Sequence, residues 1–409
     1  MQSKEKELKN SISVQDFCID KKMLEEVTEF RRWMHTNPEL SECEEKTAER
    51  ICQILKKHNI FYEDNVGGHG VIAIVNGKNS VAEKSESRTV AAKADMDALP
   101  IEERSEFPLR SCKPGVMHAC GHDANTAILL GTALYLKSQE NNFGGSVKLF
   151  FEPAEETIGG GELMVNDGCM ENPHVDKIIG LHVMPYLNVG TVEIKKGCLN
   201  AGTNEVEIIV HGTGGHAAEP DKCVDPIVTL AYIITALQTF VSRNTDPTQS
   251  AVLTFGIING GTKGNIIPES AFIKGTMRTL LPQQREYAKA RVREIAENVA
   301  KGFGAKAEVN ITESYDPVIN DDDIVDVVQS EASRLFGSEK VFQKEYPSMG
   351  AEDFSYYTKS AGGAYFHIGC KNPKEREIRN LHTDNFQIDE RCIENGIAIQ
   401  AAVLLRMLE

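Results

Sequence analysis

The chain has 409 residues, of which 41% are hydrophobic and 25% charged, and its formal net charge is −16 at pH 7. This length exceeds the usual size of a single hydrophobic core, so we expect a globular protein with two domains. Such an excess of acidic side chains disfavours binding to nucleic acid and to anionic membranes, so we expect neither as a partner.

The first third of the chain alternates predicted helices with predicted strands. Apolar residues recur at helical spacing in segments 23–34 and 44–58, and Asn37-Pro38 interrupts the pattern between them. A third segment, 121–137, is so apolar that we expect a buried helix. Short β-type runs are predicted at residues 71–75, 89–94, 147–151 and 177–183. Strands separated by helices predict a largely parallel sheet covered on both faces.

The middle of the chain has a different order of elements. Strands are predicted at residues 205–210, 251–258, 271–278 and 306–312, and helices at 224–243 and 284–302. The order β-α-β-β-α-β is that of the ferredoxin-like split βαβ pattern. We therefore expect an inserted α+β domain at residues 199–313.

After Asp316 the alternation of helix and strand returns. Helices are predicted at residues 322–336 and 390–408, and a strand at 364–368. The simplest interpretation is an α/β fold. One domain with a mostly parallel sheet would comprise residues 1–198 and 314–409, and the smaller α+β domain would interrupt it.

The amino-terminal segment and the cysteines bear on where the protein works. The first twenty residues are polar and lack the apolar core of a signal peptide. No stretch approaches the roughly 18 uninterrupted apolar residues of a membrane helix. Ten cysteines are spread without the spacing of a disulfide framework. We expect a cytoplasmic protein whose cysteines are mostly buried free thiols.

The segment Met117-His-Ala-Cys-Gly-His-Asp123 places Cys120 and His122 two positions apart. Gly121 between them permits unusual backbone angles, so both side chains can converge. Thiolate and imidazole both bind borderline divalent metals. A polar loop at the start of a helix could contain the same residues without binding a metal, so this motif alone leaves both interpretations open.

The segment Phe150-Phe-Glu-Pro-Ala-Glu-Glu156 ends an apolar run with two adjacent carboxylates, Glu155 and Glu156. Functional sites of doubly wound sheets lie at the carboxyl ends of strands. One carboxylate can bind a metal while the other accepts a proton from water, and hydrolysis of an amide needs both functions. A solvated acidic turn is the competing interpretation.

Two further histidines are candidate ligands. Gly180-Leu-His-Val183 puts His182 at the end of an apolar strand, and Asn380-Leu-His-Thr-Asp384 puts His382 in a polar loop. Taken singly, the first is more often a hydrogen-bonded core histidine, and the second is uninformative. The recurrence of such signals at strand ends favours a shared site.

An acidic pair, Asp95 and Asp97, follows the predicted strand 89–94. Period-two spacing would aim both side chains the same way if the strand continues. Such carboxylates can orient a metal-binding histidine or tune the metal. An acidic turn that ends a strand is the plainer interpretation.

Seven motifs in one order resemble the M20 metallopeptidase family. They are similar to its amidohydrolase branch, which includes hydrolases of N-acyl amino acids, hippurate and auxin conjugates, and N-acetyldiaminopimelate deacetylases. The resemblance runs from His35-Thr-Asn-Pro-Glu-Leu40 to His382. The seven motifs are Met117–Asp123, Glu152–Glu156, Gly180–His182, Gly214-Gly-His-Ala-Ala218, Asn265-Ile-Ile-Pro268, Glu352-Asp-Phe354 and Leu381-His382.

The resemblance implies two divalent metal ions per subunit and separate catalytic and metal-binding roles for the residues around them. Glu155 matches the general acid/base, and Asp95 and Asp97 match the acidic pair beside the metals. The thiolate favours zinc, cobalt or nickel, and the resemblance also admits manganese. The residues that match the metal ligands are Cys120, His122, Glu156, His182 and His382.

The inserted domain matches the family's dimerisation or lid domain, so the resemblance implies a homodimer, with a tetramer as the alternative. His216 matches a histidine that reaches the partner subunit's active site and stabilises an oxyanion. Asn265 and Arg278 match residues that hold the substrate's carboxylate, a task that suits the planar guanidinium fork.

Two positions depart from the family pattern. Asn125 stands where the family usually has a second histidine, which puts the role of that histidine in doubt here. The segment Asp221-Lys-Cys223 replaces one that usually begins with histidine. All five positions that match ligands are intact.

The implied activity is hydrolysis of the amide bond of a small N-acyl amino acid to a carboxylic acid and a free amino acid. A dipeptidase would instead prefer a free α-amine. A non-catalytic metal-dependent binding protein on the same fold is disfavoured by the presence of Glu155. A hydrolase with Cys120 as nucleophile and His122 as base would be insensitive to chelators.

Overall fold

The computed structural model describes residues 17, 19–79, 88–105 and 107–409, so Cys18 and most of the polar amino-terminal segment lie outside the described residues. The chain divides into two compact units. The first comprises Met1–Gly197, Ile319–Glu345 and Asp353–Glu409, and the second comprises Cys198–Val318 and Tyr346–Glu352. The short strands β7 (Gly197–Asn200) and β14 (Val318–Asn320) lie where the chain passes from one unit to the other.

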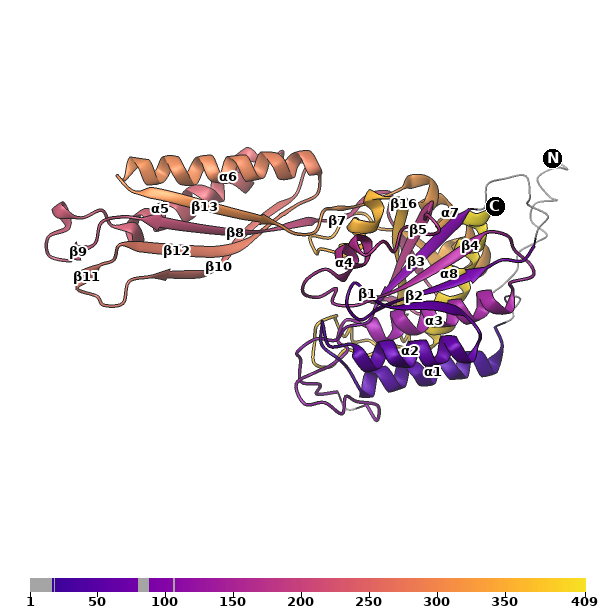
Figure 1. Ribbon diagram of the computed structural model, residues 1–409. Helices are drawn as coiled ribbons and strands as arrows, with labels where there is room; N and C mark the ends of the chain where they lie inside the picture. Colours follow the sequence, from indigo (N-terminus) through magenta and orange to yellow (C-terminus); the bar gives the residue numbers. More distant parts are fainter. Residues whose placement is uncertain (1–16, 18, 80–87, 106) are drawn as a thin grey trace. The chain divides into compact units, whose positions relative to one another are not determined.

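An eight-stranded sheet forms the framework of the first unit, in the order β1-β2-β4-β3-β5-β16-β6-β15 (Figure 1). The four central strands, β4, β3, β5 and β16, are parallel, whereas β2 and β6 run antiparallel to their inner neighbours. The predicted mostly parallel sheet is thus confirmed. The strands are β1 (Phe61–Val66), β2 (Gly70–Asn76), β3 (Thr89–Asp95), β4 (Ser146–Glu152), β5 (Lys177–Asn188), β6 (Val192–Ile194), β15 (Val341–Gln343) and β16 (Gly362–Lys371).

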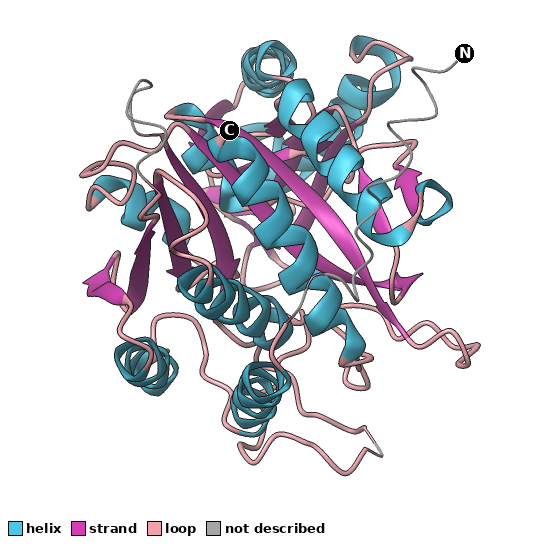
Figure 2. Ribbon diagram, turned by 90° about the vertical axis from the view of Figure 1, so that its right-hand side faces the viewer, coloured by secondary structure: helices cyan, strands magenta, loops and turns pink. Residues whose placement is uncertain are grey.

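Helices cover this sheet, as Figure 2 shows for the first unit. Residues of α3 and α8 share one large hydrophobic core with alternate residues of β4, such as Leu149 and Phe151. Phe150, which alternates with them, stacks on Tyr357 of the 3₁₀ segment Asp353–Lys359 instead. The helices are α1 (Lys21–Thr36), α2 (Glu45–Lys57), α3 (His122–Ser138), α4 (Gly160–Asn166), α7 (Asp322–Phe336) and α8 (Arg391–Leu408).

Strand β1 and helix α4 are among the elements of the first unit that were not predicted. Strand β1 has the polar sequence Phe61-Tyr-Glu-Asp-Asn-Val66 and lies at the edge of the sheet, where only its pairing with β2 defines it as a strand. Helix α4 begins Gly160-Gly161, and glycine is a poor helix former. Both elements depend on contacts with other parts of the chain.

The second unit contains a four-stranded antiparallel sheet in the order β10-β12-β8-β13. Two helices pack on it and on each other, around a core that includes Ile208, Ile233 and Val292. Two further short strands, β9 (Gly215–His216) and β11 (Ile266–Ile267), form a separate ribbon. The other elements are β8 (Gly202–His211), α5 (Pro226–Thr239), β10 (Ala251–Gly260), β12 (Ser270–Thr279), α6 (Pro282–Gly302) and β13 (Lys306–Glu313).

Helix α5 is apolar on both sides. Asp225 caps its first turn by accepting hydrogen bonds from the backbone N–H groups of Ile227 and Val228, and a π-helical turn, Phe240–Asn244, extends it. The expectation that no stretch approaches a membrane helix does not hold for Pro226–Asn244, which has a mean hydropathy of 1.2 and could cross a membrane by length and composition alone. One side of this helix packs in the core of the second unit, as expected for the core helix of a globular domain.

Candidate metal centre

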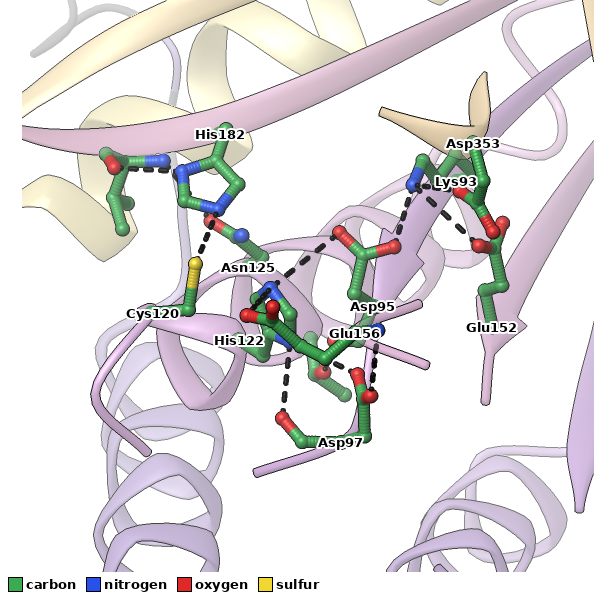
Figure 3. A network of polar contacts seen from close by, with 12 residues as sticks. Lys93, Asp95, Asp97, Cys120, His122, Asn125, Glu152, Glu156, His182 and Asp353 are labelled. Carbon is green, nitrogen blue, oxygen red and sulfur yellow. Dashed lines mark hydrogen bonds and ion pairs between the residues drawn. The ribbon is translucent and has the colours of Figure 1, made fainter. Parts of the chain in front are cut away.

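The five predicted ligand residues converge in the first unit, beside the carboxyl ends of the central strands. Figure 3 shows four of them: Cys120, His122, Glu156 and His182. The Cys120 Sγ atom lies 3.5 Å from His182 Nε2 and 3.3 Å from His382 Nε2. Glu156 Oε1 lies 3.2 Å from His382 Nε2 and 4.0 Å from His122 Nε2. These atoms form two three-residue groups that share the sulfur: Cys120 with His122 and His182, and Cys120 with Glu156 and His382.

Backbone geometry at Gly121 brings Cys120 and His122 together. Gly121 has φ +84° and ends the loop before α3, whose first residue is His122. A Cβ atom at Gly121 would lie 2.5 Å from Val183 Cγ2, so any other residue would displace that side chain and strain the backbone. The sequence-based expectation about Gly121 is therefore confirmed.

Each of two candidate ligands is oriented through its other ring nitrogen. His122 Nδ1 lies 3.0 Å from the Asp97 carbonyl oxygen and 3.1 Å from Asp97 Oδ1, and His182 Nδ1 lies 2.8 Å from the Val183 carbonyl oxygen. A carbonyl oxygen can only accept, so both Nδ1 atoms donate. Nε2 of each ring is left as the lone-pair donor, the arrangement typical of metal-binding histidines.

His382 reaches the site from a loop far along the chain. Its backbone has φ +60°, a region that non-glycine residues rarely adopt, and its N–H donates to the Ala119 carbonyl oxygen at 2.8 Å. That hydrogen bond ties the loop to the residue before Cys120. A backbone conformation of this kind is typical of functional sites, where surrounding contacts offset its cost.

The loop after β4 carries Glu155 and Glu156. Ala154, at φ +55°, donates its N–H to Glu44 Oε1 at 2.7 Å, and burial raises the pKa of Glu44 to about 7. The Glu156 N–H donates to Asp97 Oδ2 at 3.0 Å. The Glu155 side chain is buried, and one of its carboxylate oxygens lies within 4.8 Å of ligand atoms of both His122 and Glu156.

The donor set fits divalent metal ions. Tetrahedral bonds of about 2.3 Å to sulfur and about 2.0 Å to nitrogen place the two donor atoms about 3.5 Å apart, close to the sulfur–nitrogen separations above. Burial raises the pKa of the Cys120 thiol to about 12, so a thiolate here needs a cation to compensate its charge. Among the described residues, the buried Asp95 Oδ2 atom has no hydrogen-bond partner.

Asp95 and Asp97 do not contact the same atom of His122. Strand β3 ends at Asp95, so the period-two alternation that would have aimed both side chains alike does not continue. Asp97 faces His122 Nδ1, whereas Asp95 Oδ2 lies 3.9 Å from His122 Nε2. Asp97 therefore orients the imidazole, and Asp95 lies beside its lone pair.

Asn125, the departure from the family pattern, contacts the backbone next to a candidate ligand. Its Oδ1 accepts a hydrogen bond from the Val183 N–H at 3.1 Å, one residue after His182. Its Nδ2 is buried and has no hydrogen-bond partner among the residues that the structure describes. The amide thus holds the strand that carries His182.

The predicted residues of the second unit are arranged differently. His216 and Asn265 are exposed; His216 ends β9 and Asn265 immediately precedes β11, where the Ala217 N–H donates to the Asn265 carbonyl oxygen. Arg278 lies near the end of β12, which begins at Ser270. At about 3.3 Å per residue, that part of the strand covers roughly 26 Å. Within this unit the three residues are not brought together.

Three residues behind the site were assigned no role from the sequence. Lys93 belongs to the segment that carries Asp95, Glu152 to the one that carries Glu155, and Asp353 to Glu352-Asp-Phe354. All three are buried in one polar cluster. A lysine inside an otherwise apolar strand was the one sequence signal that could have indicated it.

Comparisons with known proteins identify the family of the chain. The model of the family described as Peptidase family M20/M25/M40 matches residues 91–406. An N-acetyl-L-cysteine deacetylase of Bacillus subtilis is 38% identical over 363 residues, which cover 89% of this chain and 83% of the relative. A hippurate hydrolase of Campylobacter jejuni is 34% identical over 384 residues, which cover 94% of this chain and 97% of the relative.

One similar solved structure is a protein of Bacillus subtilis described as a dinuclear metal binding peptidase from the M20 family. It is 30% identical to this chain, with a TM-score of 0.82, and the match covers 95% of this chain and 99% of that one.

Proposed function

The chain belongs to the peptidase family M20/M25/M40, and we propose that within this family it hydrolyses the amide bond of N-acyl amino acids. Relatives at 38% and 34% identity are named for an N-acetylcysteine and a hippurate substrate, both of which are N-acyl amino acids. The observation that carries the proposal is the pair of three-residue ligand groups around Cys120, with a separate carboxylate, Glu155, beside them.

Two divalent ions held by Cys120, His122, Glu156, His182 and His382 would lower the pKa of water and polarise the acyl carbonyl group. We assign the proton transfers to Glu155. Its carboxylate accepts a proton from the attacking water and later delivers it to the leaving nitrogen. Burial beside His122 keeps this carboxylate within reach of the site. The products are a carboxylic acid and a free amino acid.

Residues that bind or orient the substrate complete the proposal. Asn265 and Arg278 are proposed to bind the substrate's carboxylate, and His216 to donate a hydrogen bond to the developing oxyanion. Asp97 fixes the tautomer of His122 by accepting from its Nδ1–H, and Asp95 lies beside the site. These roles rest on the family resemblance together with the geometry of each residue.

We further propose that the protein is a homodimer that joins through the second unit. His216 and Asn265 are exposed, which suits residues supplied to another subunit. Strand β10 lies at an open edge of its sheet and carries Ile257 and Ile258, which are 54% and 64% exposed. Helix α5 exposes a further apolar group, namely Ile227, Val228 and Tyr232.

The cysteines support a reducing, cytoplasmic location as part of the proposal. All nine cysteines among the described residues are free thiols, and four besides Cys120 are buried. Buried thiols of this kind act as small apolar side chains.

The test of the proposed function is a substrate panel on the purified protein loaded in turn with Mn²⁺, Zn²⁺, Co²⁺ or Ni²⁺. Acetyl, benzoyl and indole-acetyl derivatives of one amino acid are compared with dipeptides that release the same amino acid. We expect at least one acyl derivative to be hydrolysed with a higher kcat/KM than any dipeptide. A preference for the free α-amine would indicate a dipeptidase, and metal binding without turnover would indicate a binding protein.

A further inference from the structure

Lys93 is a buried cation at the centre of three buried carboxylates. Its Nζ atom lies 2.5 Å from Asp95 Oδ1, 3.2 Å from Asp353 Oδ1 and 3.6 Å from Glu152 Oε1. The side chains of Lys93, Glu152 and Asp353 are 0% exposed and that of Asp95 is 1% exposed, so water does not screen these charges. Figure 3 shows Asp95 between Lys93 on one side and His122 on the other.

The second oxygen of each carboxylate has a different neighbour. Asp95 Oδ2 lies 3.9 Å from His122 Nε2, in the candidate metal centre. Asp353 Oδ2 accepts a hydrogen bond from the Gly161 N–H at 2.9 Å, and Glu152 Oε2 accepts one from the Tyr357 hydroxyl at 2.5 Å. The ammonium of Lys93 is thus one contact away from the metal centre and one contact away from the backbone of α4.

Both ends of the loop that carries Glu155 and Glu156 are fixed at this cluster. Glu152 is the last residue of β4, and its carbonyl oxygen accepts from the Met96 N–H at 2.9 Å. At the other end, Gly161 in α4 is held by Asp353. A Cβ atom at Gly161 would lie 3.2 Å from both the carbonyl oxygen and Oδ2 of Asp353, so backbone and carboxylate approach closely there.

We infer that Lys93 is a positioning residue for the metal centre. Its ammonium holds Asp95 beside His122 and holds Asp353, which fixes the far end of the loop with Glu155 and Glu156. Without that cation, three carboxylates would share a space that excludes water, and mutual repulsion would move Asp95 and the loop. Burial and the neighbouring charge of Asp353 raise the pKa of Glu152 well above its ordinary value, which shows how strongly these carboxylates affect one another. The inference rests on the proposed function.

Lys148 offers a matched control on the neighbouring strand. Its side chain is also buried, and its Nζ atom donates to the carbonyl oxygen of Glu171 at 2.7 Å and approaches that of Pro173 at 3.4 Å. It lies on β4, opposite Ala91 in the register with β3, and none of these contacts reaches the metal centre. Lys148→Met therefore removes a buried ammonium from the same sheet without touching the carboxylate cluster.

The experiment compares wild type, Lys93→Met, Lys93→Arg and Lys148→Met. Co²⁺ binding is titrated against a chelator buffer, and the thiolate-to-cobalt charge-transfer band and the d–d bands are recorded with kcat, KM and the melting temperature. We expect Lys93→Met to lose affinity for one Co²⁺ ion, and kcat, by about 10–100-fold, as for other residues that orient metal ligands. Its d–d bands should change while KM changes little. Lys93→Arg should recover most of the affinity, and Lys148→Met should bind Co²⁺ like the wild type.

Two outcomes would overturn the inference: a Lys93→Met variant that binds both ions with wild-type affinity and spectrum, or an equal loss of affinity in Lys148→Met. If Lys93→Met does not fold, the variant Asp353→Asn tests the positioning role instead, because it keeps the size of the side chain and removes one charge from the cluster. A wild-type spectrum and wild-type kcat in that variant would then reject the positioning role. A wild-type protein that binds no Co²⁺ at all would instead reject the proposed function.

Discussion

The ligand cluster of the first unit and the β9–β11 ribbon of the second hold their polar side chains in opposite ways. His122 and His182 are buried, and each is fixed by a hydrogen bond at its second nitrogen. His216 is exposed on a strand of two residues. The core of the first unit therefore fixes the ligand cluster, whereas the ribbon exposes His216 to solvent. Substitutions in the two regions should therefore differ in what they change.

The largest effect is expected from Glu155→Gln in the first unit. The amide cannot accept a proton from water, so kcat should fall by about 10²–10⁴-fold, the usual contribution of a general acid/base. Metal content and melting temperature should stay close to those of the wild type, because Gln has the same size. Steady-state kinetics and metal analysis of the variant check this, and near-normal turnover would refute the role of Glu155.

His216→Ala tests the ribbon and should lower kcat by about 10²–10³-fold if this side chain stabilises the oxyanion. The melting temperature should not change, because the side chain is exposed. Equal amounts of this variant and Glu155→Gln, mixed under conditions of subunit exchange, should recover about a quarter of wild-type activity. Half of the dimers are then mixed, and each mixed dimer has one intact site. If mixing restores nothing, His216 acts within its own subunit.

A smaller effect is expected from Asn125→Ala, which removes the acceptor for the Val183 N–H. Metal affinity should fall by about 10-fold, as for other residues that orient a ligand. Thr132→Ala is the matched control, since Thr132 is buried on the same helix and bonds to Ile128 and Gln400 instead. Chelator competition on both variants distinguishes them. Equal metal affinities would show that Asn125 contributes to packing alone.

The smallest effect concerns stability at low pH. Burial raises the pKa of Glu193, but hydrogen bonds with His367, Tyr186 and Lys344 outweigh it and bring the pKa to about 2. A lowered pKa stabilises the fold above the ordinary value near 4.5, and this contribution is lost as the pH falls towards 2. The full shift corresponds to about 3 kcal/mol, which solvent screening reduces to about 1–2 kcal/mol.

Urea unfolding of wild type and Glu193→Gln at pH 6 and pH 3 measures this contribution. The stability difference between the two proteins should shrink at the lower pH. A constant difference would mean that the Glu193 carboxylate is not held by its neighbours.

The fold was predictable where apolar residues repeat. The helix expected at 322–336 is observed as α7, Asp322–Phe336, because its buried side chains recur at helical spacing. The polar edge strand β1 and the glycine-led helix α4 were missed, since pairing and packing with distant segments define them. The family resemblance drawn from ordered motifs is confirmed, including its amidohydrolase branch.

The candidate site was predictable residue by residue but not in its contacts. The short motifs indicated Cys120 and His382, which are 262 positions apart in sequence. In the structure, Cys120 Sγ lies 3.3 Å from His382 Nε2. No local pattern encodes that approach. The same holds for Asn125, whose acceptor role depends on the backbone of a neighbouring strand, and for Lys93, whose partners come from three segments. Such contacts exist only once the sheet has formed.

The most direct test of the central claim is metal analysis of the purified wild-type protein, combined with activity during removal and return of the metal. The two ligand groups that share Cys120 predict two divalent ions per subunit. Hydrolysis of an N-acyl amino acid should disappear with chelation and return when the ions are restored, and Cys120→Ala should retain fewer than two ions. Full activity after complete removal of metal would contradict the account and would favour Cys120 as a nucleophile.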